Sequence, residues 1–110
     1  MSWKTLQEIA QLEEIITNSF QKPQVIFKHS TRCSISDVAK TRLERNAFPD
    51  NIDFYYLDLI AYRSVSNHIT ETMQVQHESP QVLLIKNGKC VYHESHMGIQ
   101  FDEIIEQATA

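Results

Sequence analysis

The stretch PQVLLIKNGKCVY, residues 80–92, contains two apolar runs that are separated by Asn87-Gly88. Asn-Gly between apolar runs is the strongest short-range signal for a tight β-hairpin, because both central residues of the turn adopt positive φ. The stretch therefore predicts two neighbouring antiparallel strands. Pro80 opens the first of them, at a position where a strand tolerates proline.

Helices and strands alternate upstream of this hairpin. Apolar residues at helical spacing predict helices over roughly residues 3–19, 35–43 and 65–73, and a last helix around residues 101–105. Short apolar runs predict two buried strands at residues 25–27 and 52–57.

The order of these elements predicts the fold. A strand–helix–strand unit has parallel strands and a right-handed crossover, whereas the strands of a hairpin are antiparallel. Joining the two gives one α/β domain over residues 1–110, with a four-stranded mixed sheet and helices on both faces. This is the thioredoxin-like arrangement, and the arrangement alone assigns no chemistry.

Composition narrows the class of protein and of partner. Hydrophobic residues make up 42% of the chain and charged residues 22%, as in ordinary soluble domains. A formal net charge of −4 leaves no basic field, so we expect neither a nucleic-acid nor a membrane partner. Polar residues interrupt the first helix where a signal peptide would be apolar, and no run approaches the ~20 apolar residues of a membrane span. We therefore expect a cytoplasmic protein with reduced thiols.

A single cysteine stands where the first predicted strand gives way to a helix, in STRCSISD, residues 30–37. The first amides of a helix have no intrahelical partner, and the helix dipole adds about half a positive charge there. If Cys33 is at the cap, the amides of Ile35 and Ser36 can point at its sulfur and favour the thiolate, which is the nucleophilic form.

The neighbours of Cys33 decide between two interpretations. The commonest fate of a free cysteine is that of a small buried hydrophobic residue. Lys28, His29 and Arg32 bring cationic groups close in sequence, against one nearby carboxylate, Asp37. Since cations favour a thiolate, the polar setting favours the nucleophile over the buried residue.

The two serines after Cys33 bear on its chemistry. Ser34, with Asp37 three residues later, also matches a capping box, in which case Cys33 precedes the cap and still faces the open amides. Ser36 occupies the position where a dithiol oxidoreductase has its second cysteine, and a serine can hydrogen-bond a thiolate but cannot attack a mixed disulfide. The pattern therefore predicts monothiol exchange: Cys33 takes a small thiol from a target protein, and an external thiol regenerates it.

The other thiol, Cys90, follows the Asn-Gly turn on the last predicted strand. A disulfide requires two Cα atoms within about 7 Å. In a thioredoxin-like sheet the final strand lies at an edge, away from the end of the first strand. We therefore interpret Cys90 as a buried bystander and keep a Cys33–Cys90 dithiol mechanism as the weakest alternative.

Four segments carry a resemblance: HSTRCSIS (29–36), DLIAYR (58–63), HESPQ (77–81) and KNGK (86–89). Together they resemble the bacilliredoxin-like YtxJ family, a thioredoxin-like monothiol family that is linked to the low-molecular-weight thiol bacillithiol. The resemblance spans nearly the whole chain. It implies removal of bacillithiol from S-bacillithiolated proteins, with bacillithiol as a co-substrate and no tightly bound cofactor.

The resemblance also implies roles for residues. Cys33 would be the attacking cysteine, and Pro80 a cis-proline against its sulfur that leaves the backbone of the preceding residue free to pair with a bound peptide or thiol. The supporting residues would be Thr31, Arg32, Ser34, Ser36, Ser79 and Pro80, with Arg32 attracting an anionic thiol. One position departs from the pattern: the better-known form of the family has Cys-Pro-Ile-Ser, and Ser34 stands in place of its proline.

The residues themselves leave alternatives open. The small thiol could equally be glutathione, coenzyme A or cysteine. The domain could be a non-catalytic binding module, or could hold an iron–sulfur cluster with an external thiol, as some monothiol glutaredoxins with Cys-x-x-Ser do. His93 and His96 lack the further cysteine or carboxylate ligands of a zinc site, so we expect no metal ion.

Overall fold

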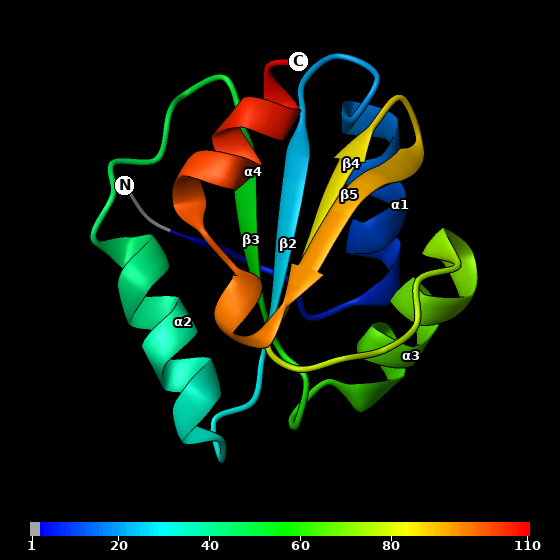
Figure 1. Cartoon of the computed structure of the whole chain (residues 1–110). Coiled ribbons are helices and arrows are strands. Elements are labelled where there is room, and N and C mark those ends of the chain that lie inside the picture. The colour runs from blue at the N-terminus through cyan, green and yellow to red at the C-terminus, as the bar shows by residue number, and fades with distance from the viewer. Residues whose placement is uncertain (1–2) are drawn as a thin grey trace.

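The computed structural model describes residues 3–110. It contains a five-stranded mixed sheet that lies between two layers of helices (Figure 1). The strands are β1 (Lys4–Thr5), β2 (Gln24–His29), β3 (Asp53–Asp58), β4 (Gln81–Lys86) and β5 (Lys89–Ser95). The helices are α1 (Ile9–Asn18), α2 (Ser34–Glu44), α3 (Arg63–Met73) and α4 (Phe101–Ala108), with a short 3-10 turn, η1 (His96–Gly98), before α4.

The strand order across the sheet is β1-β3-β2-β4-β5. The first three strands in this order run parallel, and β4 and β5 run antiparallel to their neighbours. In the β2–β4 pair, Lys28 lies opposite Gln81. The carboxyl end of β2 and the first residue of β4 therefore meet at the same edge of the sheet.

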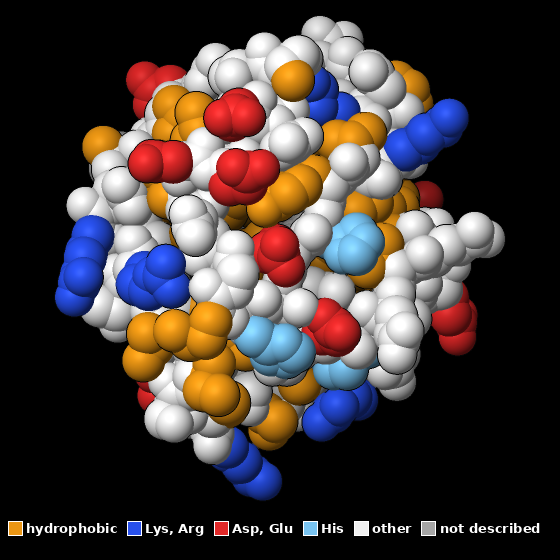
Figure 2. Space-filling model, viewed as in Figure 1, with side chains coloured by type: hydrophobic (Ala, Val, Ile, Leu, Met, Phe, Trp, Pro, Cys, Tyr) orange, Lys and Arg blue, Asp and Glu red, His pale blue; other side chains and the backbone are white. Residues whose placement is uncertain are grey.

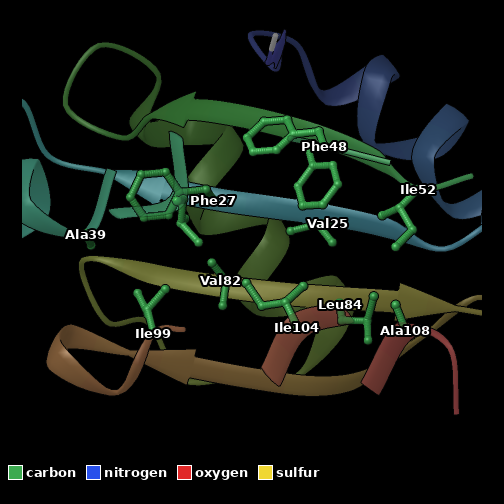
Figure 3. Close-up of a cluster of buried hydrophobic side chains, with 12 residues drawn as sticks. Val25, Phe27, Ala39, Phe48, Ile52, Val82, Leu84, Ile99, Ile104 and Ala108 are labelled. Atoms are coloured by element: carbon green, nitrogen blue, oxygen red, sulfur yellow. The ribbon is translucent and has the colours of Figure 1, made fainter. Parts of the chain in front are cut away.

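Helices cover both faces of the sheet, as expected from the order of elements. In Figure 1, α2 and α4 lie on one side of the sheet, and α1 and α3 lie on the other. Along β2, Val25 and Phe27 point into the α2/α4 layer, while Ile26 points into the α1/α3 layer. Figure 3 shows the first of these layers, in which Val25 and Phe27 of β2 belong to the same buried cluster as Ile104 of α4. The strand is apolar throughout because both of its faces are buried.

The predicted hairpin is confirmed. Asn87 and Gly88 have φ of 54° and 79°, which are the positive values that this type of turn requires. Ser19, at the end of α1, holds the turn: its carbonyl accepts the N–H of Asn87 (3.0 Å) and its hydroxyl accepts the N–H of Gly88 (2.8 Å).

The first helix and the strand count differ from the sequence-based expectation. The helix begins at Ile9 rather than near residue 3, because Glu8 and Gln11 form a capping box that starts it there. The preceding residues form β1 instead, and the N–H of Leu6 donates to the carbonyl of Tyr56 in β3 (2.9 Å). The sheet consequently has five strands where four were expected. Within residues 3–110, no helix combines the length and the apolar character needed to span a membrane.

Candidate active site

Cys33 is the N-cap residue of α2, at the end of a short turn that follows β2. Its backbone is extended (φ −119°, ψ 121°), and its carbonyl accepts the N–H of Asp37 (3.2 Å), which closes the first turn of the helix. The N–H of Cys33 donates in turn to the carbonyl of Ser30 (3.2 Å). The side chain of Cys33 is half-buried and the thiol is free. The sulfur is thus presented at the mouth of a helix with a path to solvent.

The structure shows which residue caps α2, and it corrects the expected contact of the Cys33 thiol. Cys33, and not Ser34, is the N-cap. Its thiol, however, makes no hydrogen bond to the first amides of the helix, so the expected contact with the amides of Ile35 and Ser36 is absent. A protonated thiol is only a weak acceptor and gains little from such a contact, whereas a thiolate at the same position gains more.

Ser36 is turned inward and is fully buried. Its hydroxyl accepts the backbone N–H of Ser30 (3.0 Å) and lies 2.7 Å from Nδ1 of His29. The Ser36 hydroxyl therefore does not serve the Cys33 sulfur, because it already donates or accepts on the β2 side of the turn. Its observed role is to fasten the turn to the end of β2.

His29 was expected to bring a cationic group near Cys33, and the structure places it in a buried site instead. Its side chain is only 3% exposed, and its ring lies between those of Phe27 and Tyr56, with centroids 5.7 and 5.5 Å away. Its Nε2 lies 3.3 Å from a carboxylate oxygen of Asp37. Burial lowers the pKa of His29, and Lys40 acts in the same direction, while Asp37 opposes the shift. Burial is the largest of these influences, so the ring is neutral at pH 7.

Pro80 is buried, and its bond to Ser79 is cis, as the resemblance implied. Since Lys28 pairs with Gln81, continuing the register by one residue brings Pro80 next to His29, at the edge of the sheet where the Cys33 turn begins. The Pro80 carbonyl accepts the N–H of His96 (3.0 Å), which ties the start of β4 to η1.

Cys90 lies elsewhere in the sheet. It is on the edge strand β5 opposite Ile85, four residues along β4 from Gln81. Four residues of strand span roughly 13 Å, so Cys90 lies about that far along the sheet from the end at which Gln81 pairs with Lys28 and the Cys33 turn begins. A disulfide permits only roughly 7 Å between the two Cα atoms. Burial raises the pKa of the Cys90 thiol, and its sulfur lies 3.4 Å from the carbonyl of Tyr92. The position of Cys90 fits a packed bystander rather than a resolving cysteine.

The remaining predicted residues lie on the surface around Cys33. Thr31, Arg32 and Ser34 are exposed, while Ser79 is half-buried. Large apolar side chains are also exposed nearby, on α2 and on η1, which packs against α2: Ile35, Val38 and Met97. Figure 2 shows hydrophobic side chains gathered on this side of the molecule beside histidines. Ile35 and Val38 belong to the apolar spacing that predicted this helix, yet both side chains are exposed.

Lys28 is a buried charge that the sequence analysis assigned to the surroundings of Cys33. Its side chain has no solvent exposure and points to the α3 side of the sheet, opposite to His29. Its Nζ lies 3.4 Å from the Thr70 hydroxyl and 3.3 Å from Nδ1 of His77. Burial lowers the pKa of the Lys28 amine to about 8. Strand alternation could have indicated that successive residues Lys28 and His29 face opposite layers.

Comparisons with known proteins agree with this geometry. A family model described as monothiol bacilliredoxin BrxC matches residues 4–104. A solved structure described as a candidate oxidoreductase with a thioredoxin fold is 31% identical, with a TM-score of 0.82, over 96% of this chain and 92% of the other. The thioredoxins of Malassezia sympodialis (17% identity, TM-score 0.78, 99% and 92% covered) and Fasciola hepatica (19%, 0.75, 96% and 96%) share the fold. The thioredoxin-like fold expected from the sequence is confirmed.

Proposed function

The chain belongs to the monothiol bacilliredoxin family, and from this premise we propose that it removes bacillithiol from S-bacillithiolated proteins by thiol–disulfide exchange at Cys33. The observation that carries the proposal is the position of Cys33: a half-buried free thiol at the N-cap of α2, in a segment without a second cysteine. A helix N-terminus favours an anionic sulfur there.

The reaction is an exchange of one disulfide for another. The Cys33 thiolate attacks the sulfur of the small thiol in the mixed disulfide. A new bond joins Cys33 to the small thiol, the original disulfide breaks, and the cysteine of the target protein leaves as a thiolate. A second molecule of the small thiol, as its thiolate, then attacks the adduct on Cys33. That step releases the small thiol as its own disulfide and restores the Cys33 thiolate.

The surroundings of Cys33 support a mechanism that uses one thiol of the protein rather than two. Ser36 stands at the place of a second cysteine and is held inward by Ser30 and His29. Cys90 is on the far edge strand, and its thiol is held in the protonated form by burial. With no internal group to displace the adduct, regeneration depends on an external thiol.

The supporting residues would act on the small thiol. Pro80 and Ser79 lie at the edge of the sheet next to the Cys33 turn, where they can form one wall of the binding site. Arg32 is exposed next to Cys33 and can attract the carboxylates of bacillithiol, although an exposed charge contributes little binding energy. The main selectivity for the small thiol would therefore come from shape at this wall.

Intact-mass measurement tests the proposal. The protein is incubated with the disulfides of bacillithiol, glutathione, coenzyme A and cysteine, and separately with a protein that carries bacillithiol on one cysteine. We expect one adduct per chain, on Cys33, with release of the target thiol and fastest reaction with bacillithiol. Cys33→Ser should form no adduct, and Cys90→Ser should behave as the wild type. An unmodified Cys33, or loss of two hydrogens with no added thiol, would contradict monothiol exchange.

A further inference from the structure

His29, Ser36 and Asp37 form a chain of polar contacts beneath the Cys33 turn. His29 and Ser36 are almost completely buried, with exposed fractions of 3% and 0%, and Asp37 is at the surface. Ring nitrogen Nδ1 of His29 meets the Ser36 hydroxyl at 2.7 Å, and Nε2 meets Asp37 at 3.3 Å. Nδ1 of the buried imidazole is therefore hydrogen-bonded, and Nε2 lies close to a carboxylate.

These contacts define where the protons are. The carboxylate of Asp37 can only accept, so Nε2 of His29 carries the proton of the neutral ring. Nδ1 is then an acceptor, and the Ser36 hydroxyl donates to it. The same hydroxyl oxygen accepts the backbone N–H of Ser30. The Ser36 hydroxyl has this ring nitrogen as an acceptor only when His29 is neutral.

The chain of contacts reaches Cys33 through Ser30. The carbonyl of Ser30 accepts the N–H of Cys33 (3.2 Å), and its hydroxyl accepts the N–H of Arg32 (3.4 Å). Ser30 is thus held by Ser36 on one side and holds the backbone of Cys33 on the other. The carbonyl of His29 accepts the N–H of Leu59 (3.0 Å), which anchors the chain to β3 and its following turn.

We propose that neutral His29 is a positioning residue for Cys33: through Ser36 and Ser30 it fixes the turn that places the sulfur at the N-terminus of α2. The proposal rests on the function proposed for Cys33 and goes beyond it, because it names a residue that touches no substrate. His29 holds the Ser36 hydroxyl, the hydroxyl holds the backbone of Ser30, and Ser30 sets the start of the helix.

Protonation of His29 disrupts this arrangement. The imidazolium gains a proton on Nδ1, so the Ser36 hydroxyl loses its acceptor and its own proton is left buried without a partner. The charged or titratable groups around the ring are Asp37, Lys40 and Glu44 of α2, and Asp58 and Tyr56 of β3. On the β4 side the nearest residue in register is Pro80, which does not titrate. Below neutral pH, Cys33 then loses reactivity because the turn that holds it loosens.

The test follows alkylation of Cys33 by iodoacetamide against pH, with Cys90→Ser in every variant so that only one thiol reacts. His29→Asn keeps an amide oxygen as acceptor for Ser36 but cannot titrate. Ser36→Ala and His29→Leu remove the hydroxyl and the acceptor, respectively. His93→Asn, at an exposed histidine of β5, is the matched control. Circular dichroism shows which variants are folded.

Two results are expected. At pH 7, His29→Asn reacts about as fast as the wild type, while Ser36→Ala and His29→Leu react about fivefold more slowly, as the loss of about one hydrogen bond predicts. In acid, the logarithm of the rate falls more steeply in the wild type and in His93→Asn than in His29→Asn, because only the first two keep an imidazole at position 29 that can be protonated.

Equal slopes in the wild type and His29→Asn would overturn the proposal, as would a folded Ser36→Ala variant with the wild-type rate and pH profile. If His29→Leu does not fold, the slope comparison between the wild type and His29→Asn decides the question. Alkylation by iodoacetamide reports on Cys33 whatever thiol the protein exchanges. Failure to accept bacillithiol would therefore remove the proposed function and leave this test intact.

Discussion

The amine of Lys28 lies 3.3 Å from Nδ1 of His77, in a position without solvent exposure and, among residues 3–110, without a carboxylate partner. His77 belongs to the loop between α3 and β4 that leads to Pro80. A buried amine is thus joined to the segment that forms one wall of the candidate site. Burial lowers the pKa of this amine to about 8, which means that folding disfavours its charged form.

Lys28→Met should stabilise the protein at pH 7. Methionine fills a similar volume without a charge to desolvate, so we expect the free energy of unfolding to rise by about 1–3 kcal/mol. The wild-type amine has a pKa of about 8 when folded, below its unfolded value of about 10.4. The unfolded chain therefore binds more protons between these values, and wild-type stability rises with pH across that window.

Urea unfolding at pH 7 and at about pH 10 measures both effects. In Lys28→Met the gain with pH that comes from this amine should disappear, whereas Lys89→Met, at an exposed lysine of β5, should keep it. Lower stability of Lys28→Met at pH 7 would mean that the contacts with Thr70 and His77 outweigh the cost of burying the amine.

Gly88→Ala should destabilise the β4–β5 hairpin for two separable reasons. Gly88 has φ of +79°, where a side chain is strained, and an added Cβ would lie 2.8 Å from Cζ of Phe20. We expect a loss of at least about 1 kcal/mol in the free energy of unfolding. Adding Phe20→Ala to Gly88→Ala should recover the steric part and leave the backbone part. Phe20→Ala alone is the reference, and a strictly additive double variant would show that the ring moves aside at no cost.

Local signals in the sequence were sufficient for the hairpin and for the order of the larger elements. The Asn87-Gly88 turn depends on two neighbouring residues, and helical spacing such as that of Val65, Ile69 and Met73 needs only one element to be visible. The strand β1 could not be predicted in this way. Its two residues carry no pattern of their own, and they are a strand only because β3 pairs with them.

The place of Cys33 at the start of a helix was predictable from the sequence, but the contacts beneath it were not. Cys33 and Pro80 are marked by residue type and by their positions between elements. The contacts of Ser36 with His29 and Ser30 join the first turn of a helix to the end of a strand, so they depend on how α2 packs on the sheet. The sequence alone does not show whether the Ser36 side chain points toward Cys33 or toward His29. The packing of α2 on the sheet shows that it points toward His29.

Asp53 should stabilise the fold in a pH-dependent manner. Its side chain is 9% exposed, and its carboxylate accepts from Gln24 Nε2 at 2.8 Å. It also lies 2.9 Å from Lys22 Nζ and 3.0 Å from Lys4 Nζ. Burial raises the pKa of Asp53, but the hydrogen bonds from these three groups outweigh burial, and the net shift is downward. This contribution is therefore fully present above the unfolded pKa of about 3.9 and is lost as the pH falls through the lower folded value.

Asp53→Asn tests this contribution through urea unfolding at pH 7 and at about pH 3. At pH 7 we expect a loss of about 1–3 kcal/mol, because two lysines lose a buried carboxylate partner. The difference from the wild type should shrink at the lower pH, where the wild-type carboxylate is partly protonated. Asp50→Asn, at an exposed position in the loop that leads into β3, should change little at either pH. A difference that stays constant with pH would assign the effect to packing rather than to charge.

Ser34→Pro restores the residue that the better-known form of the family has after its cysteine, and it separates helix rigidity from thiol chemistry. Ser34 is the first residue of α2, where proline is favoured because the N–H has no intrahelical partner. We expect the free energy of unfolding to rise by about 0.4–1 kcal/mol through a less flexible unfolded chain.

The amides that an N-cap side chain contacts are those of the second and third helical residues, here Ile35 and Ser36, and proline at position 34 removes neither. Exchange at Cys33 should therefore stay within about twofold of the wild type, by the same reasoning. Ser34→Ala, measured in parallel, removes the hydroxyl without adding the ring. A large change of exchange rate in Ser34→Pro that is missing in Ser34→Ala would show that the ring itself resets the position of the Cys33 sulfur.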